Sequence, residues 1–324
     1  MGKILIVRGG AIGDFLLTIP AIQLLRESLP DPHIEVLGYR NVADVATAFG
    51  IVEGARSIEY GPMARFFVPN SDLDTGLTNY IGQFDLVLSY LFDPDEYFKN
   101  NIKRCGVETF IQGPHQVKDD RALGHAALQL ARPLEGLAMF LENHAPVFDF
   151  SKARQLESSA VLGKLTVREE RPLIALHPGS GSPSKNWDIV RWVEVCEGLR
   201  SQYPAAAFAV ITGEAEDQRM DVFQRLFAEA GLPHISIHAA PLPEVAHALR
   251  RCDLFLGHDS GVSHLAGAVG IPAVVLFGPT VHEIWAPKNP EVHVIPSPTF
   301  AMDGIQPDLV IAAASEKLAR KFRY

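Results

Sequence analysis

The chain has 324 residues, of which 47% are hydrophobic, and a formal net charge of −9 at pH 7. At roughly 100–200 residues per domain, this length predicts two domains. The acidic balance argues against a general binder of nucleic acid or anionic membranes, because such proteins need a basic footprint. The three cysteines, Cys105, Cys196 and Cys252, are odd in number and far apart. They favour a reducing cytoplasm over a disulfide framework or a zinc site.

Targeting and membrane-spanning segments are not predicted. The N-terminal apolar run that ends at Val7 is too short for a signal peptide. The longest apolar stretch, residues 265–277, is interrupted by Gly270 and Pro272 and falls well below the ~20 residues that span a bilayer. We therefore expect a cytoplasmic protein without a transmembrane helix.

Apolar runs alternate with helical patterns in both halves of the chain, which is typical of parallel strands covered on both faces. The first half predicts strands at 3–7, 34–37 and 86–89 and helices at 15–29 and 42–49. The second half predicts strands at 173–176, 208–211, 235–238, 254–257 and 273–277, with a helix at 188–202 among the segments between them. The pattern predicts an α/β protein of two doubly wound units.

The boundary between the units is placed in the segment Ser151–Arg171, which has many charges and no strand-like run. We expect domains at 1–160 and 161–324; the alternative is one large continuous sheet. The last segment, Pro307–Phe322, has helical spacing and is a candidate to pack back on the first domain.

The first informative loop, Arg8–Asp14, follows a strand and opens a helix. Gly10 and Gly13 let its backbone turn tightly and approach a ligand. The dinucleotide fingerprint G-x-G-x-x-G is absent, because Arg8 stands where its first glycine belongs. Asp14 places a carboxylate at the carboxyl edge of the strands, which suits proton abstraction from a hydroxyl. The alternative is that Asp14 only caps the helix.

The second loop runs from His177 to Trp187, again between a strand and a helix. Small residues such as Gly179 and Ser180 clear space for a ligand. Lys185 places an ammonium that would stabilise a leaving diphosphate. The alternative makes Lys185 a solvated loop charge and Trp187 a core residue at the start of the helix.

The third loop, Thr212–Gln218, carries the carboxylates Glu214, Glu216 and Asp217. Carboxylates that follow a strand commonly accept hydrogen bonds from ribose hydroxyls. They are equally common in the first turn of a helix, where the macrodipole favours them.

The fourth loop, Gly257–His264, is the most informative segment of the chain. Its glycines and short polar residues precede a helix, whose free N–H groups and macrodipole attract a phosphate. Asp259 and Ser260 can cap that helix, Gly261 permits close approach, and His264 lies one turn into it. The spacing fits neither a serine hydrolase elbow nor a metal site on one helix face, and His264 could equally be a structural histidine.

A fifth loop at 277–280 also follows a strand, so all five loops fall where doubly wound sheets bind ligands. Their agreement predicts a nucleotide on the second domain and a nucleophile-bearing partner on the first. The same two-domain arrangement would also suit a nucleotide-sugar epimerase or hydrolase, or a non-catalytic nucleotide-binding protein. The missing fingerprint makes a dinucleotide oxidoreductase the least favoured.

Four segments together resemble the heptosyltransferases of glycosyltransferase family 9, in order and over almost the whole chain. They are ILIVRGGAIGDFLLTIPAI, IALHPGSGSPSKNW, ITGEAEDQ and GHDSGVSHLAGAVGIPAVVLFGPT. The resemblance implies a GT-B fold, in which two Rossmann-like domains face each other across a cleft. It also implies an inverting, metal-independent transfer without a cofactor. The donor is a nucleotide sugar, most often ADP-heptose, and the acceptor is a lipid-linked saccharide of the lipopolysaccharide core.

The same resemblance implies roles for particular residues. Asp14 matches the general base and Lys185 the contact to the donor phosphate. The donor diphosphate and sugar site matches Asp259, Ser260, Gly261 and His264, and the ribose-binding acid matches Glu216 or Asp217. Ser260 replaces the threonine frequent in the family, which keeps the hydroxyl, and Arg8 replaces a frequent lysine.

The resemblance also bears on partners. No nucleic-acid partner is expected from the acidic balance, and the resemblance implies contact with the inner membrane only peripherally, through the lipid-linked acceptor. Basic side chains of the first domain either meet phosphates of that acceptor or are scattered solvated charges; they are Lys99, Lys103, Arg104, Lys118 and Arg121.

Overall fold

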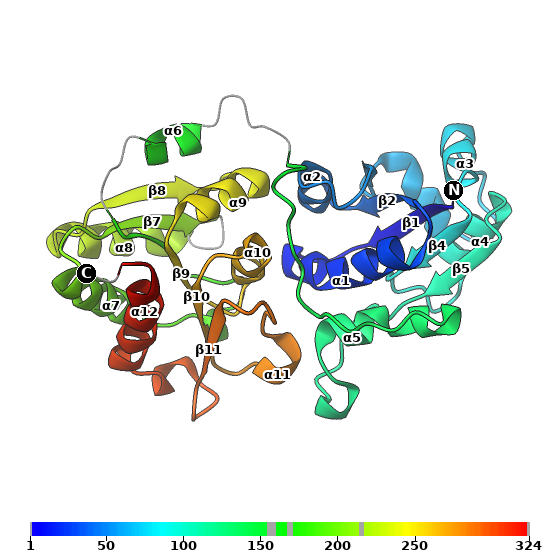
Figure 1. The fold of residues 1–324 in the computed structure, drawn as a ribbon. Coiled ribbons are helices and arrows are strands. Elements are labelled where there is room, and N and C mark those ends of the chain that lie inside the picture. Colours follow the sequence, from blue (N-terminus) through cyan, green and yellow to red (C-terminus); the bar gives the residue numbers. More distant parts are fainter. Residues whose placement is uncertain (1, 154–159, 167–170, 214–216, 323–324) are drawn as a thin grey trace. The chain divides into compact units, whose positions relative to one another are not determined.

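The computed structural model describes residues 2–153, 160–166, 171–213 and 217–322 (Figure 1). Its contacts divide the chain into two compact units. One consists of Met1–His144 with Asp149–Arg154, and the other of Ala145–Phe148 with Gln155–Tyr324. The short piece Ala145–Phe148 belongs to the second unit because Phe148 N donates to the Ala268 carbonyl, 2.9 Å away.

The first unit contains a five-stranded parallel sheet in the order β3-β2-β1-β4-β5. Its strands are β1 (Lys3–Arg8), β2 (His33–Gly38), β3 (Gly54–Ser57), β4 (Leu86–Ser89) and β5 (Thr109–Gln112). The predictions of β1, β2 and β4 are confirmed. The sequence did not predict β3 and β5, because these edge strands bury none of their side chains fully and so lack an apolar run.

The helices of the first unit are α1 (Ile12–Ser28), α2 (Arg40–Ala48), α3 (Thr75–Ile81), α4 (Tyr97–Arg104) and α5 (Ala126–Ala131). Helix α1 is buried along most of its length and packs against α5 and α2. It begins three residues before the predicted helix, so Asp14 lies within its first turn. The loop between β1 and α1 is therefore short, Gly9–Ala11, and Gly13 belongs to the helix.

The second unit contains a separate six-stranded parallel sheet in the order β11-β10-β9-β6-β7-β8. Its strands are β6 (Leu173–His177), β7 (Ala207–Thr212), β8 (His234–His238), β9 (Leu254–His258), β10 (Ala273–Phe277) and β11 (Val292–Pro296). The five predicted strands are confirmed, and the alternative of one continuous sheet is wrong. The edge strand β11 was not predicted, because only one of its side chains is fully buried.

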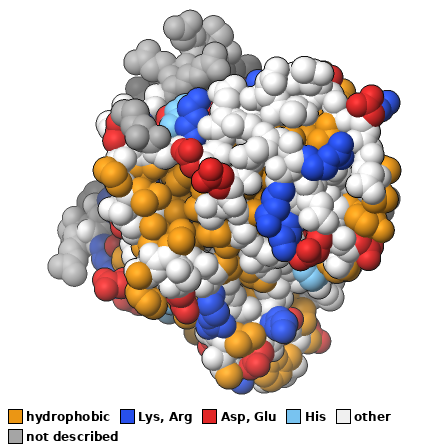
Figure 2. All heavy atoms as spheres, turned by 90° about the vertical axis from the view of Figure 1, so that its right-hand side faces the viewer, with side chains coloured by type: hydrophobic (Ala, Val, Ile, Leu, Met, Phe, Trp, Pro, Cys, Tyr) orange, Lys and Arg blue, Asp and Glu red, His pale blue; other side chains and the backbone are white. Residues whose placement is uncertain are grey.

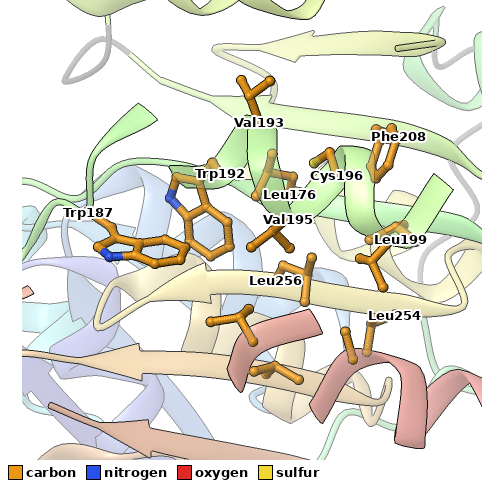
Figure 3. Close-up of a cluster of buried hydrophobic side chains, with 14 of the residues drawn as sticks. Leu176, Trp187, Trp192, Val193, Val195, Cys196, Leu199, Phe208, Leu254 and Leu256 are labelled. Atoms are coloured by element: carbon orange, nitrogen blue, oxygen red, sulfur yellow. The ribbon is translucent and has the colours of Figure 1, made fainter. Parts of the chain in front are cut away.

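The helices of the second unit are α6 (Ala160–Thr166), α7 (Ile189–Gln202), α8 (Asp217–Glu229), α9 (Leu242–Arg251), α10 (Gly261–Val269), α11 (His282–Trp285) and α12 (Pro307–Lys321). Figure 3 shows the core between α7 and the sheet, where Trp187 and Trp192 meet edge to face with ring centroids 5.0 Å apart. Helix α12 packs against α7 and buries Val310, Ala314 and Leu318 in this same core. The expected helix at the end of the chain is thus confirmed, and its buried apolar side chains belong to the core of the second unit.

The described helices include none that is both long and apolar enough to cross a membrane.

Candidate functional site

The carboxyl end of β1 and the first turn of α1 hold Asp14 in the first unit. Asp14 Oδ2 accepts a hydrogen bond from Ala11 N at 3.0 Å, which satisfies one free N–H at the start of α1. Asp14 Oδ1 lies 3.4 Å from Arg8 Nη2, and the Asp14 side chain is still 36% exposed. Asp14 therefore does cap the helix, yet its carboxylate remains accessible to a ligand.

Gly10 makes this arrangement possible. Its φ of 97° lies in the left-handed region, and a Cβ at this position would come within 2.7 Å of Asp14 Oδ2. Only glycine fits both the backbone and the space. Gly13, in contrast, occupies the second position of α1, immediately before Asp14.

Arg8, which stands where the dinucleotide fingerprint has its first glycine, is the partner of Asp14. Its side chain is buried, with the guanidinium 5.4 Å from the centroid of the Tyr90 ring. The Tyr90 hydroxyl donates to the Leu130 carbonyl at 2.9 Å, which fixes that ring. Burial lowers the pKa of Arg8, and the charge of Asp14 acts in the opposite direction. The pair thus places a fixed cation directly behind the carboxylate.

In the second unit, Lys185 and Asp259 meet. Lys185 Nζ lies 2.7 Å from Asp259 Oδ2, with the Lys185 side chain 32% exposed and the Asp259 side chain 9% exposed. Their loops follow β6 and β9, which are neighbours in the sheet with His177 opposite Gly257. The alternative of a solvated loop charge is therefore wrong for Lys185. Trp187, as that alternative also held, is a core residue.

His258 connects the loop that carries Lys185 with the loop that carries Asp259. Its Nε2 accepts hydrogen bonds from Trp187 N at 2.9 Å and from Trp192 Nε1 at 3.1 Å. An Nε2 that accepts from two donors carries no proton. This buried histidine is a structural link between β9 and the start of α7, and it holds the Lys185 loop against the Asp259 loop.

The start of α10 lies beside this ion pair. Ser260 is the N-cap residue and its Oγ accepts from Ser263 N at 3.4 Å, while Gly261 is the first helical residue. His264 is buried one turn further along, and the Ser263 hydroxyl donates to the His258 carbonyl. The first N–H groups of a helix have no partner within it, so the loop presents donors next to Lys185.

The other residues predicted to bind the donor nucleotide are Gly179, Ser180, Glu216 and Asp217. Gly179 and Ser180 are buried, and Ser180 Oγ donates to the Ser182 carbonyl at 2.9 Å, so that hydroxyl shapes its own loop. Glu216 lies outside the described residues. Asp217 is the first residue of α8, and its side chain is not among those described.

The basic side chains of the first unit are interspersed with acidic ones on the face shown in Figure 2. Lys99 Nζ pairs with Glu96 at 2.6 Å, and Arg104 Nη1 donates to Asn101 Oδ1 at 2.7 Å. These contacts favour the alternative of scattered charge over a phosphate site on α4.

A family model for glycosyltransferase family 9 (heptosyltransferase) matches residues 104–305 of the chain. The lipooligosaccharide heptosyltransferase 2 of Haemophilus ducreyi is 23% identical over 322 residues, which cover 90% of this chain and 88% of that protein.

Solved structures share the fold over nearly the whole chain. A glycosyl transferase family 9 protein from Veillonella parvula has a TM-score of 0.79 at 18% identity, covering 98% of this chain and 97% of that one. ADP-heptose LPS heptosyltransferase II of E. coli has a TM-score of 0.74 at 15% identity, covering 98% and 99%. The iron-containing glycosyltransferase TibC of enterotoxigenic E. coli is more distant, with a TM-score of 0.51 at 15% identity and coverage of 90% and 62%.

Proposed function

Because the chain belongs to glycosyltransferase family 9, we propose that it transfers a heptosyl residue from ADP-heptose to a saccharide of the lipopolysaccharide core. The relatives and solved neighbours that bear this activity in their names support the donor and acceptor classes. The observation in the chain itself that carries the proposal is the Lys185–Asp259 pair beside the start of α10.

The second unit is proposed to hold the donor diphosphate. An ammonium has three N–H donors, so Lys185 can keep its ion pair with Asp259 and still donate to a phosphate oxygen. Asp259 then acts as a positioning residue that aims Lys185, and the N–H groups at Ser260 and Gly261 add donors for the same charge. Together they stabilise negative charge that grows on the diphosphate as the glycosidic bond breaks. Glu216 or Asp217 is proposed to accept from the ribose.

The first unit is proposed to supply the base. Asp14 takes the proton of an acceptor hydroxyl while that oxygen attacks the anomeric carbon. The new C–O bond forms as the bond to the diphosphate breaks, ADP departs, and the proton resides on Asp14. A single displacement of this kind inverts the anomeric configuration.

The transfer is proposed to need no metal ion, because Lys185 and the start of α10 supply the positive charge at the diphosphate. The iron in the TibC structure makes this point worth a direct test. Action is proposed at the cytoplasmic face of the inner membrane, with membrane contact made through the lipid-linked acceptor.

The experiment is transfer from ADP-heptose to a delipidated core oligosaccharide, followed by mass spectrometry of the product and NMR of its new anomeric centre. We expect an inverted linkage, unchanged rates in EDTA, and a loss of at least about a hundredfold in kcat for Asp14→Asn with ADP affinity retained. ADP release without acceptor would instead assign a hydrolase, and an isomeric ADP-sugar formed without acceptor would assign an epimerase. If the Asp14→Asn variant did not fold, Asp14 would be assigned only the role of capping the helix.

A further inference from the structure

Two exposed rings stand at the carboxyl edge of the first sheet, outside the residues discussed so far. Phe92 follows β4 and is 66% exposed, and His115 follows β5 and is also exposed. Their ring centroids lie 4.7 Å apart with the ring planes at 56°. Both rings are thus outside the core and accessible from solvent.

The two loops that carry these rings are held rigidly. Gln112 Nε2 lies within hydrogen-bond distance of the carbonyls of Ser89, Leu91 and Gly113, at 3.1, 3.0 and 2.9 Å. One amide thus ties the chain after β4 to the chain after β5. The loop beyond Phe92 is fixed as well, because the Asp93 carboxylate accepts from two backbone N–H groups at the start of α4. These hydrogen bonds hold the backbone on both sides of Phe92 and the backbone just before His115.

The pair also lies on the same edge as Asp14. Strand β4 is the neighbour of β1, with Ser89 opposite Val7, and β5 is the neighbour of β4. At about 4.8 Å between strands, the rings follow strands one and two steps from β1, or roughly 5 to 10 Å along the edge. Tyr90 connects the two places: its ring lies under Arg8, the partner of Asp14, and it precedes Phe92 by two residues.

We propose that Phe92 and His115 form a stacking platform for a sugar ring of the acceptor. The C–H face of a pyranose is apolar and flat enough to pack on an aromatic ring, and a rigid exposed ring offers this contact at low entropic cost. The acceptor is chosen because the loops that carry the platform follow β4 and β5, on the same sheet edge as the carboxylate proposed to activate the acceptor hydroxyl. This assignment rests on the proposed function for the choice of saccharide.

The test compares Phe92→Ala with Phe140→Ala, a control of matched exposure at 64% in the same unit. Acceptor KM, donor KM and kcat are measured in the transfer reaction. Binding of delipidated core oligosaccharide is measured separately by saturation-transfer NMR and calorimetry. We expect Phe92→Ala to raise both the acceptor KM and the oligosaccharide Kd about tenfold, with kcat and donor KM within twofold of the parent. Phe92→Trp should restore binding, and Phe140→Ala should match the parent.

Unchanged oligosaccharide binding by a folded Phe92→Ala would overturn the platform, and so would a parent protein that does not bind the oligosaccharide. A loss seen only with the lipid-linked acceptor would also overturn it, because the ring would then contact lipid. A parent that binds the oligosaccharide through Phe92 but transfers no sugar would contradict the proposed function and leave the platform intact.

Discussion

Replacing Lys185 with methionine separates the structural value of the Lys185–Asp259 pair from its proposed catalytic value. Methionine is unbranched and one atom shorter than lysine, and the change removes the charge that lies 2.7 Å from Asp259 Oδ2. A fully buried pair loses ~3–5 kcal/mol when one partner is removed, and an exposed pair loses ~0–1 kcal/mol. With Asp259 at 9% and Lys185 at 32% exposure, we expect a loss of about 1–2 kcal/mol. That corresponds to a fall of roughly 2–8 °C in Tm for a unit of this size.

The catalytic loss should be larger than the structural one. If Lys185 takes up charge on the departing diphosphate, its removal should lower kcat by about 10²- to 10³-fold, as the loss of one well-placed donor does elsewhere. The assay is product formation from ADP-heptose at saturating acceptor, with Tm measured by differential scanning calorimetry on the same preparations.

The double variant Lys185→Met/Asp259→Asn is the control. It removes the unpaired carboxylate together with the ammonium, so it should recover about half or more of the lost stability. Activity should stay low, because the ammonium is still missing. Recovery of activity along with stability would refute the reasoning, since Lys185 would then act only as the counterion of Asp259.

Two further perturbations test other parts of the structure. Gly10→Ala should cost about 1–3 kcal/mol of stability because of the positive φ at this position, and it should lower kcat/KM by displacing Asp14. Gly61→Ala is the control for both measurements, because its Cβ would meet nothing within 4 Å. Burial raises the pKa of the Cys252 thiol to about 12, from a usual value near 9. The unfolded thiol therefore ionises at a lower pH than the folded one, and between about pH 9 and 12 this residue should reduce stability by ~1.4 kcal/mol per pH unit. Urea titrations of Cys252→Ala from pH 8 to 10.5 should show a shallower decline than the parent, and equal slopes would contradict the buried, neutral thiol.

The sequence determined the central strands of both sheets, because a strand covered on both faces must be apolar throughout. Strands such as β1 and β6 therefore appear as uninterrupted runs, and the turns that follow them mark the ligand edge. The edge strands β3, β5 and β11 were not predicted, because a strand that meets solvent can be polar and carries no such run. The edge strand β8 was predicted because Ile235 and Ile237 are buried. The candidate residues Asp14, Lys185 and Asp259 were found because each lies in the connection between a predicted strand and the helix predicted after it.

Only the tertiary structure decided which of these residues meet. Lys185 and Asp259 are 74 positions apart, and they form a pair because β6 and β9 are neighbours in the sheet and His258 ties their loops together. Tyr90 reaches Arg8 for the same kind of reason, since β4 lies next to β1. Hydropathy along a chain specifies which segments are buried but not the order in which strands lie side by side. The pairing of side chains across that order is therefore a property of the folded protein.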